Sequence, residues 1–152
     1  MDFCVVETPV GFLRMEADGS ALTRVEFCAG PCAAPQSDLL RRAAQQLAEY
    51  FSGARRTFSI PLAPRGTPFQ RAVWSALCDI PYGQTRSYGQ IAASVGNPRA
   101  ARAVGMACNR NPIGILIPCH RVLGANGALT GYAGGMDKKA ALLALERETP
   151  DT

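Results

Sequence analysis

The sequence predicts an α+β protein in two parts, a small antiparallel sheet with one helix and then a mostly helical part. Three short β-compatible runs at residues 3–7, 11–17 and 21–27 are separated by turn sequences, which is typical of an antiparallel meander. Apolar residues at helical spacing follow between Leu39 and Phe51. Capping sequences later in the chain mark several further helices.

Composition limits the chain to one ordinary domain or two small lobes. It has 152 residues, of which 47% are hydrophobic and 18% are charged, and these proportions are typical of a globular protein that folds in water. We find neither a signal peptide pattern nor an apolar run of membrane-spanning length. We therefore expect a cytoplasmic location, or a nuclear one in a eukaryote, and no membrane association.

A proline- and glycine-rich stretch at residues 61–66 resists both helix and central strand. We therefore predict an N-terminal domain at residues 1–62 and a C-terminal domain at residues 63–152. The first domain shows no catalytic motif of its own.

The six cysteines are expected to be free thiols, because nothing indicates an oxidising compartment. Cys78 and Cys108 lie among apolar residues of predicted helices and are interpreted as core residues. Cys4, Cys28 and Cys32 lack the second cysteine pair or the nearby histidine that a thiolate metal site needs. We expect neither a metal nor a cofactor.

Capping sequences predict the helices of the second domain. Thr67-Pro68-Phe69-Gln70 supplies an N-cap, a proline at the first helical position and a glutamine that completes a capping box. Ser87-Tyr88-Gly89-Gln90 repeats the box, and Asn97-Pro98 predicts a helix from Arg99 to about Asn109. The last two helices, joined by residues 95–98, form a helix-turn-helix.

The second helix of this pair is predicted to carry a basic face. Arg99, Arg102, Met106 and Arg110 follow one another at offsets of three, four and four, so they share one side of a helix. No acidic residue occurs between residues 86 and 121. Such a face is typical of a helix that contacts DNA, and a solvated helix surface is the alternative.

The run from Ile115 to Val122 carries the candidate chemistry. An apolar, strand-like segment ends at Pro118 and is followed at once by Cys119, His120 and a further cation. Neighbouring cations favour the thiolate, which is the reactive form of cysteine, and His120 is the only histidine in the chain.

A final helix, for which Asp137 is the predicted cap, places Glu146 beside the apolar Leu142 and Leu143. A carboxylate in that position needs a partner, and His120 is the economical choice. Cys119, His120 and Glu146 then form a nucleophile, a base and an orienting group.

Two reaction classes fit this set of residues. A cysteine hydrolase would pass through a thioester that water opens, whereas an alkyl acceptor would end as a thioether and be consumed in one turnover. Glycine-rich loops at residues 124–127 and 131–135 permit close approach of a ligand. With the basic helix they favour the acceptor, because its substrate could be a damaged base in DNA.

The segment Ile117–Val122 resembles the active-site signature of the O6-alkylguanine-DNA alkyltransferases. The resemblance continues in the same order across residues 67 to 147, through Thr67 to Trp74, Ser87-Tyr88, Ala101 to Gly105, Asn111-Pro112, Gly131 to Gly135 and Glu146. It implies a ribonuclease H-like N-terminal domain and a winged-helix-like C-terminal domain. It also implies irreversible transfer of an alkyl group from O6-alkylguanine to Cys119, with O4-alkylthymine left open as a substrate.

The resemblance also assigns roles around the thiol. His120 would generate the thiolate through a bridging water, and Glu146 would orient the imidazole. Asn111 would brace the active-site turn. The alternative is that Asn111 is an ordinary turn or cap residue, as the Asn-Pro sequence suggests. Tyr88 would donate a hydrogen bond to the guanine as charge develops on it.

The remaining implied roles concern the flipped-out nucleotide. Tyr132 would pack on the base, and backbone groups near Val122 would read its edge. Ala133 stands where some relatives have serine, so any hydrogen bond there would come from the backbone alone. Arg102 would take the vacated space from a helix in the minor groove, with Arg99 on the same face.

The implied partner is therefore double-stranded DNA that contains alkylated guanine, bound by a monomer, with cooperative assembly on DNA left open. A protein that binds the lesion without reacting is the alternative function. Relatives of that kind have tryptophan at the acceptor position, and Cys119 argues against it.

Overall fold

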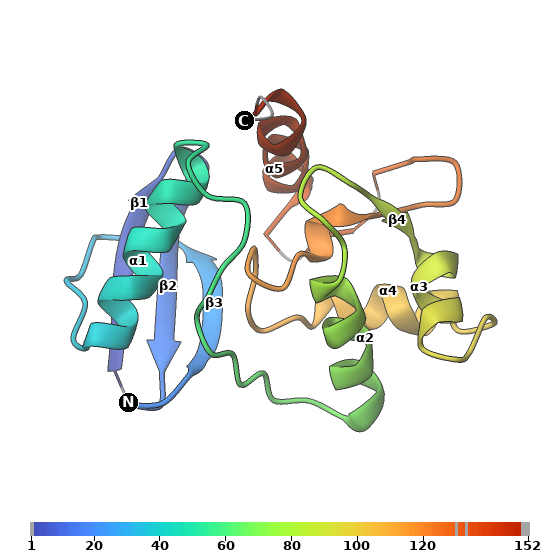
Figure 1. Ribbon diagram of the computed structural model, residues 1–152, viewed down its shortest axis with the longest axis horizontal. Coiled ribbons are helices and arrows are strands. Elements are labelled where there is room, and N and C mark those ends of the chain that lie inside the picture. Colours follow the sequence, from blue (N-terminus) through green and yellow to red (C-terminus); the bar gives the residue numbers. More distant parts are fainter. Residues whose placement is uncertain (1, 130, 133, 150–152) are drawn as a thin grey trace. The chain divides into compact units, whose positions relative to one another are not determined.

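The computed structural model describes residues 2–129, 131–132 and 134–149, which form two compact units (Figure 1). Unit 1 comprises residues 1–65 with 112–114, and unit 2 comprises residues 66–111 with 115–152. The short segment 112–114 thus clusters with the first unit although it lies between two stretches of the second. The predicted boundary between residues 62 and 63 stays a prediction.

Unit 1 is a three-stranded antiparallel sheet with one helix (Figure 1). Strands β1 (Asp2–Thr8), β2 (Gly11–Ala17) and β3 (Leu22–Cys28) pair in sequence order, and α1 (Asp38–Phe51) packs on β1 and β2. Every second residue of β2, from Leu13 onward, is buried, as a strand with one covered face requires. The predicted meander and helix, and with them the α+β class, are confirmed.

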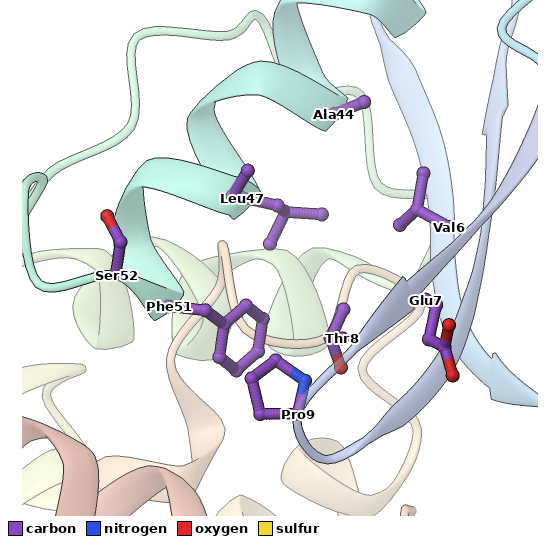
Figure 2. A pocket seen from close by; sticks show the side chains of 9 residues that line it. Val6, Glu7, Thr8, Pro9, Ala44, Leu47, Phe51 and Ser52 are labelled. Carbon is purple, nitrogen blue, oxygen red and sulfur yellow. The ribbon is translucent and has the colours of Figure 1, made fainter.

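Unit 1 also holds a mostly apolar groove of about 470 Å³ (Figure 2). Leu47 and Phe51 of α1 lie on one side of it, and Val6 and Pro9 of the first hairpin lie on the other. No cysteine or histidine lines the groove, so it is not the predicted reactive site.

Unit 2 contains the helices α2 (Pro68–Cys78), α3 (Tyr88–Ser94), α4 (Ala101–Asn109) and α5 (Met136–Glu148). Both predicted capping boxes are present, because Thr67 and Ser87 each accept from the backbone N–H three residues later. Trp74 of α2 is buried, and its indole N–H donates to the carbonyl of Ala107 at 2.9 Å. This bond joins α2 to α4 inside the core of unit 2.

Two very short strands connect the helix-turn-helix to the cysteine segment. Strand β4 (Arg86–Ser87) lies directly before α3, and it pairs in parallel with β5 (Val122–Leu123). Strand β5 in turn follows η1 (Cys119–Arg121), a single turn of 3-10 helix. The pairing brings the first residue of α3 close to the end of the cysteine segment.

The start of α4 differs from the prediction. The carbonyl of Asn97 accepts from Ala100 N–H at 3.0 Å in a turn, and Ala100 occupies the N-cap position without a side-chain cap. Arg99 therefore lies in this turn before the helix, outside α4.

Three further predictions are wrong. Residues 115–117 form a turn instead of a strand, because they find no strand partner in the described chain. Gly135, with φ of 105°, occupies the N-cap of α5, and Asp137 lies in its first turn. Cys78 is exposed at the C-terminal end of α2, whereas Cys108 is buried as predicted.

No helix within residues 2–129, 131–132 and 134–149 has both the length and the apolar character needed to cross a membrane. Over the same ranges, no group of three or more histidine, cysteine, aspartate or glutamate side chains is placed to hold a metal ion.

Candidate active site

Cys119 lies buried at the start of η1, where the side chain of Asn111 contacts its sulfur. Asn111 Nδ2 donates to Cys119 Sγ at 3.2 Å and to the carbonyl of Ile117 at 2.9 Å. One amide group therefore binds both the sulfur and the turn that precedes it. The structure thus brings together two of the predicted site residues.

The turn between Asn111 and Cys119 contains a strained residue. Ile115 has φ of 70°, the one positive value for a non-glycine residue in the described ranges, and its β-branched side chain is fully buried. Such a conformation costs on the order of 1–3 kcal/mol and persists only where the surroundings impose it. The packing of the turn therefore fixes the path of the chain into Cys119.

Burial raises the pKa of the Cys119 thiol to about 11, although the Asn111 hydrogen bond and the charge of Lys139 act in the opposite direction. The expectation that adjacent cations hold Cys119 as a thiolate is therefore wrong for the protein without DNA. His120 is neutral because burial lowers its pKa, and the charge of Arg121 is paired with Glu146. A base has to remove the thiol proton.

His120 is fully buried, and its Nε2 lies 2.7 Å from Oε2 of Glu146. Burial lowers the pKa of His120, and this effect outweighs the opposing hydrogen bond and charge of Glu146. The imidazole is therefore neutral. Its proton lies on Nε2, and this N–H donates a hydrogen bond to the carboxylate of Glu146. Nδ1 then carries the lone pair, and it has no hydrogen-bond partner among the described residues.

Glu146 accepts hydrogen bonds from His120, Arg121 and Gly83. Besides His120, Arg121 Nε donates at 2.8 Å and Nη2 at 2.9 Å, and the N–H of Gly83 donates at 3.2 Å. Burial opposes ionisation, but the hydrogen bonds from His120 and Arg121 outweigh it and hold the pKa of Glu146 well below its usual range. The carboxylate can therefore orient the imidazole without taking its proton.

Sequence reasoning missed the part that Arg121 plays. Its guanidinium is buried, binds Glu146 through two nitrogens and donates from Nη1 to the carbonyl of Ile80 at 2.7 Å. Two parallel N–H···O bonds are the strong form of this ion pair. The signal available was its position directly after His120, in the segment that also supplies the cysteine.

Lys139 is the second residue that sequence reasoning missed. It is fully buried on α5, and its Nζ lies 3.5 Å from Tyr88 Oη and 3.3 Å from the carbonyl of Gly131. Burial lowers the pKa of Lys139, whereas negative charge on Cys119 or Cys108 would raise it. A cation therefore lies within electrostatic range of the thiol and in contact with the phenol.

Other predicted site residues surround this cluster or lie apart from it. Tyr132 is half-buried, and burial together with charge on Cys119 raises the pKa of its phenol. Val122 is fully buried in β5. Arg102 is exposed on α4 and Arg99 is exposed in the turn before it. Ala133 lies outside the described residues.

Cys108, on the inner side of α4, is the second buried thiol of this region. Burial, followed by charge on Cys119, raises its pKa to about 12. It stays a neutral thiol at physiological pH and packs as a small apolar residue.

A helix-turn-helix beside a buried thiol, a neutral histidine and an ionised glutamate defines a DNA-binding protein with a nucleophilic cysteine. Comparison with known families makes the assignment specific. The family model described as 6-O-methylguanine DNA methyltransferase, DNA binding domain, matches residues 68–148, and the ribonuclease-like domain of the same name matches residues 3–64. The chain belongs to the family of methylated-DNA–protein-cysteine methyltransferases.

Individual relatives resemble the chain over nearly its whole length. The methylated-DNA–protein-cysteine methyltransferase of Methanosarcina acetivorans is 50% identical over 96% of this chain and 98% of its own length. That of Mycolicibacterium paratuberculosis is 48% identical over 97% of this chain and 93% of its own. The resemblance inferred from the sequence motifs is confirmed.

Solved structures show the same similarity. The crystal structure of the Mycobacterium tuberculosis O6-methylguanine methyltransferase matches with a TM-score of 0.90 and 43% identity, covering 100% of this chain and 96% of that chain. The crystal structure of Mycobacterium tuberculosis OGT in complex with DNA matches with a TM-score of 0.89 and 46% identity, covering 95% of this chain and 92% of that chain.

Proposed function

We propose that this protein repairs DNA directly, by moving the alkyl group of O6-alkylguanine from double-stranded DNA onto Cys119. The observation that carries the proposal is the pairing of a buried thiol, held by Asn111, with a neutral His120 whose Nε2 is bound to Glu146. The relatives reported above are named for transfer of a methyl group from DNA to a protein cysteine.

The proton path follows from the protonation states. Nδ1 of His120 is the basic nitrogen, and it takes the thiol proton through a bridging water. The imidazolium that forms is stabilised by the ionised Glu146 at 2.7 Å. Glu146 stays ionised because Arg121 binds it at both oxygens.

The transfer then forms one bond and breaks one bond. Sγ of Cys119 attacks the alkyl carbon, the carbon–O6 bond breaks, and its electron pair stays on the guanine. Tyr88 donates a hydrogen bond to the guanine as this charge develops. Lys139, with its ammonium group 3.5 Å from Tyr88 Oη, stabilises negative charge that shifts to the phenol.

The product explains why the protein acts once. A thioether has no leaving group comparable to that of a thioester, so no water or base on the protein can free Cys119 again. The reaction needs no cofactor, because the thiol and the alkylated base supply every bond that changes.

The DNA-binding part of the proposal concerns the helix-turn-helix. A base inside the duplex cannot reach a buried thiol, so the nucleotide has to be flipped out. Arg102, exposed on α4, takes the vacated space, and Arg99 contacts the backbone from the turn before α4. Tyr132, Val122 and the backbone of Ala133 are proposed to hold the extruded base.

The proposal is tested with a duplex that carries a single O6-methylguanine. Methyl groups should leave the DNA in an amount equal to the amount of protein, and Cys119→Ser should transfer none. Tight binding of the duplex without transfer would instead support a lesion-binding protein. Repeated turnover on an ester would support a cysteine hydrolase.

A further inference from the structure

Helix α4 exposes a large apolar side chain in the middle of its basic surface. Met106 is 62% exposed, compared with 42% for Leu129 and 39% for Met136, the other large apolar residues exposed in the described chain. Arg102 lies four residues before it on α4, the C-cap residue Arg110 lies four residues after it, and both are exposed. Residues four apart are neighbours on a helix surface.

A single exposed apolar residue is common and needs no explanation by itself. The surroundings of Met106 are what distinguish it. Arginines lie at both ends of the strip, the small Ala103 is exposed beside it, and residues 86–121 contain no acidic side chain. The strip is therefore positive at its ends, and apolar and slim in its centre.

This pattern matches the chemistry of the minor groove of DNA. Phosphates run along the two rims of the groove, within reach of an arginine such as Arg110, and the walls are formed by sugars with apolar surfaces. Proteins that bind the minor groove frequently place methionine or other apolar residues against base steps, which opens the groove. A partner protein with a charged surface would offer no comparable apolar wall for the thioether of Met106.

We infer that Met106 is a DNA-contact residue, which packs in the minor groove beside the nucleotide that Arg102 displaces. Four helical residues span about 6 Å, or about two base steps at 3.4 Å each. The thioether thus contacts the groove about two base pairs from the flipped nucleotide and helps to keep the groove open. This inference rests on the proposed function, because it requires duplex DNA as the substrate.

The experiment compares Met106→Ala, Met106→Gln and Met106→Leu with the wild type. Second-order rates are measured with an O6-methylguanine duplex and with the free O6-methylguanine base. We expect the alanine and glutamine variants to lose about tenfold on the duplex, which corresponds to about 1.4 kcal/mol. The leucine variant should retain the wild-type rate, and all three should react normally with the free base.

Two controls separate a DNA contact from other roles. Met136→Ala removes another exposed methionine, at the start of α5, and should leave the duplex rate unchanged. Met106→Gln removes no charge, so the dependence of DNA binding on salt should keep its slope. An equal loss on duplex and free base, or the same loss in Met136→Ala, would overturn the inference.

The outcomes also separate this inference from the function on which it rests. If the wild type transfers no methyl group from the duplex, the proposed function fails. If the wild type transfers it and the alanine and glutamine variants match its duplex rate, the inference alone fails. A change of sedimentation in the free alanine variant, with an unchanged duplex rate, would assign Met106 to contact between two copies of the chain.

Discussion

The neutral state of His120 predicts how the stability of the protein depends on pH. Its pKa is lowered in the folded protein from the ordinary 6.5 because the imidazole is buried. Below that pH the unfolded chain therefore binds a proton that the folded protein does not, and the free energy of unfolding falls. The contribution of the neutral imidazole to the free energy of unfolding is complete above pH 6.5, and it is lost as the pH falls toward the pKa of His120 in the folded protein.

The size of the effect has a clear upper limit. One proton gives at most about 1.4 kcal/mol per pH unit, or about 2 kcal/mol between pH 6.5 and 5. For a chain of this length that loss lowers Tm by roughly 4–8 °C. The carboxyl of Glu146 adds to the loss only below its ordinary pKa of 4.5, and His120 is the sole histidine.

The assay is urea unfolding at several pH values between 7.5 and 5 for the wild type and for His120→Gln. The wild type should lose stability as the pH falls, and the variant should show a flatter profile. A wild-type stability that stays constant or rises at low pH would refute the reasoning. It would mean that His120 is a cation in the folded protein and cannot act as the base.

Three further predictions concern single substitutions. Glu146→Gln leaves the buried Arg121 without its counter-charge, so denaturant unfolding should show a loss of about 3–5 kcal/mol; an unchanged midpoint would contradict this. Lys139→Met should slow alkylation of Cys119 by iodoacetamide about tenfold at equal pH, since a nearby cation favours the thiolate, and Lys139→Arg should retain part of the rate. Arg102→Ala should weaken repair of duplex DNA more than reaction with the free modified base, and equal losses would argue against its role in base flipping.

Local features of the fold could be predicted from the sequence because their causes are local. Thr67 and Ser87 bond to backbone groups three residues away, and those bonds begin α2 and α3 wherever the helices pack. The pairing of His120 with Glu146, 26 residues apart, was predictable because one imidazole and one misplaced carboxylate left few alternatives.

The errors arose where tertiary contacts decide the outcome. An apolar run at residues 115–117 indicates burial, but it does not distinguish a strand from a buried turn, and the positive φ of Ile115 has no sequence signal. Arg99 fell outside α4 because the carbonyl of Asn97 bonds within a turn.

Lys139 was overlooked because lysine is rarely buried. Its spacing was informative all the same. Positions 139, 142, 143 and 146 follow the offsets of three, four and seven that define one helix face, and the structure buries all four. The buried face of α5 therefore extends one turn further toward its N-terminus than its leucines alone indicate.

The central claim is that the alkyl group is transferred to the sulfur of Cys119. After reaction with an O6-methylguanine duplex, the protein should be digested and its cysteine peptides compared by mass with those of untreated protein. We expect the mass of one methyl group on the peptide that contains Cys119, and no change on peptides that contain the other five cysteines. Cys119 is not the acceptor if the DNA loses its methyl group while Cys119 stays unmodified, or if the methyl group is found on Cys108.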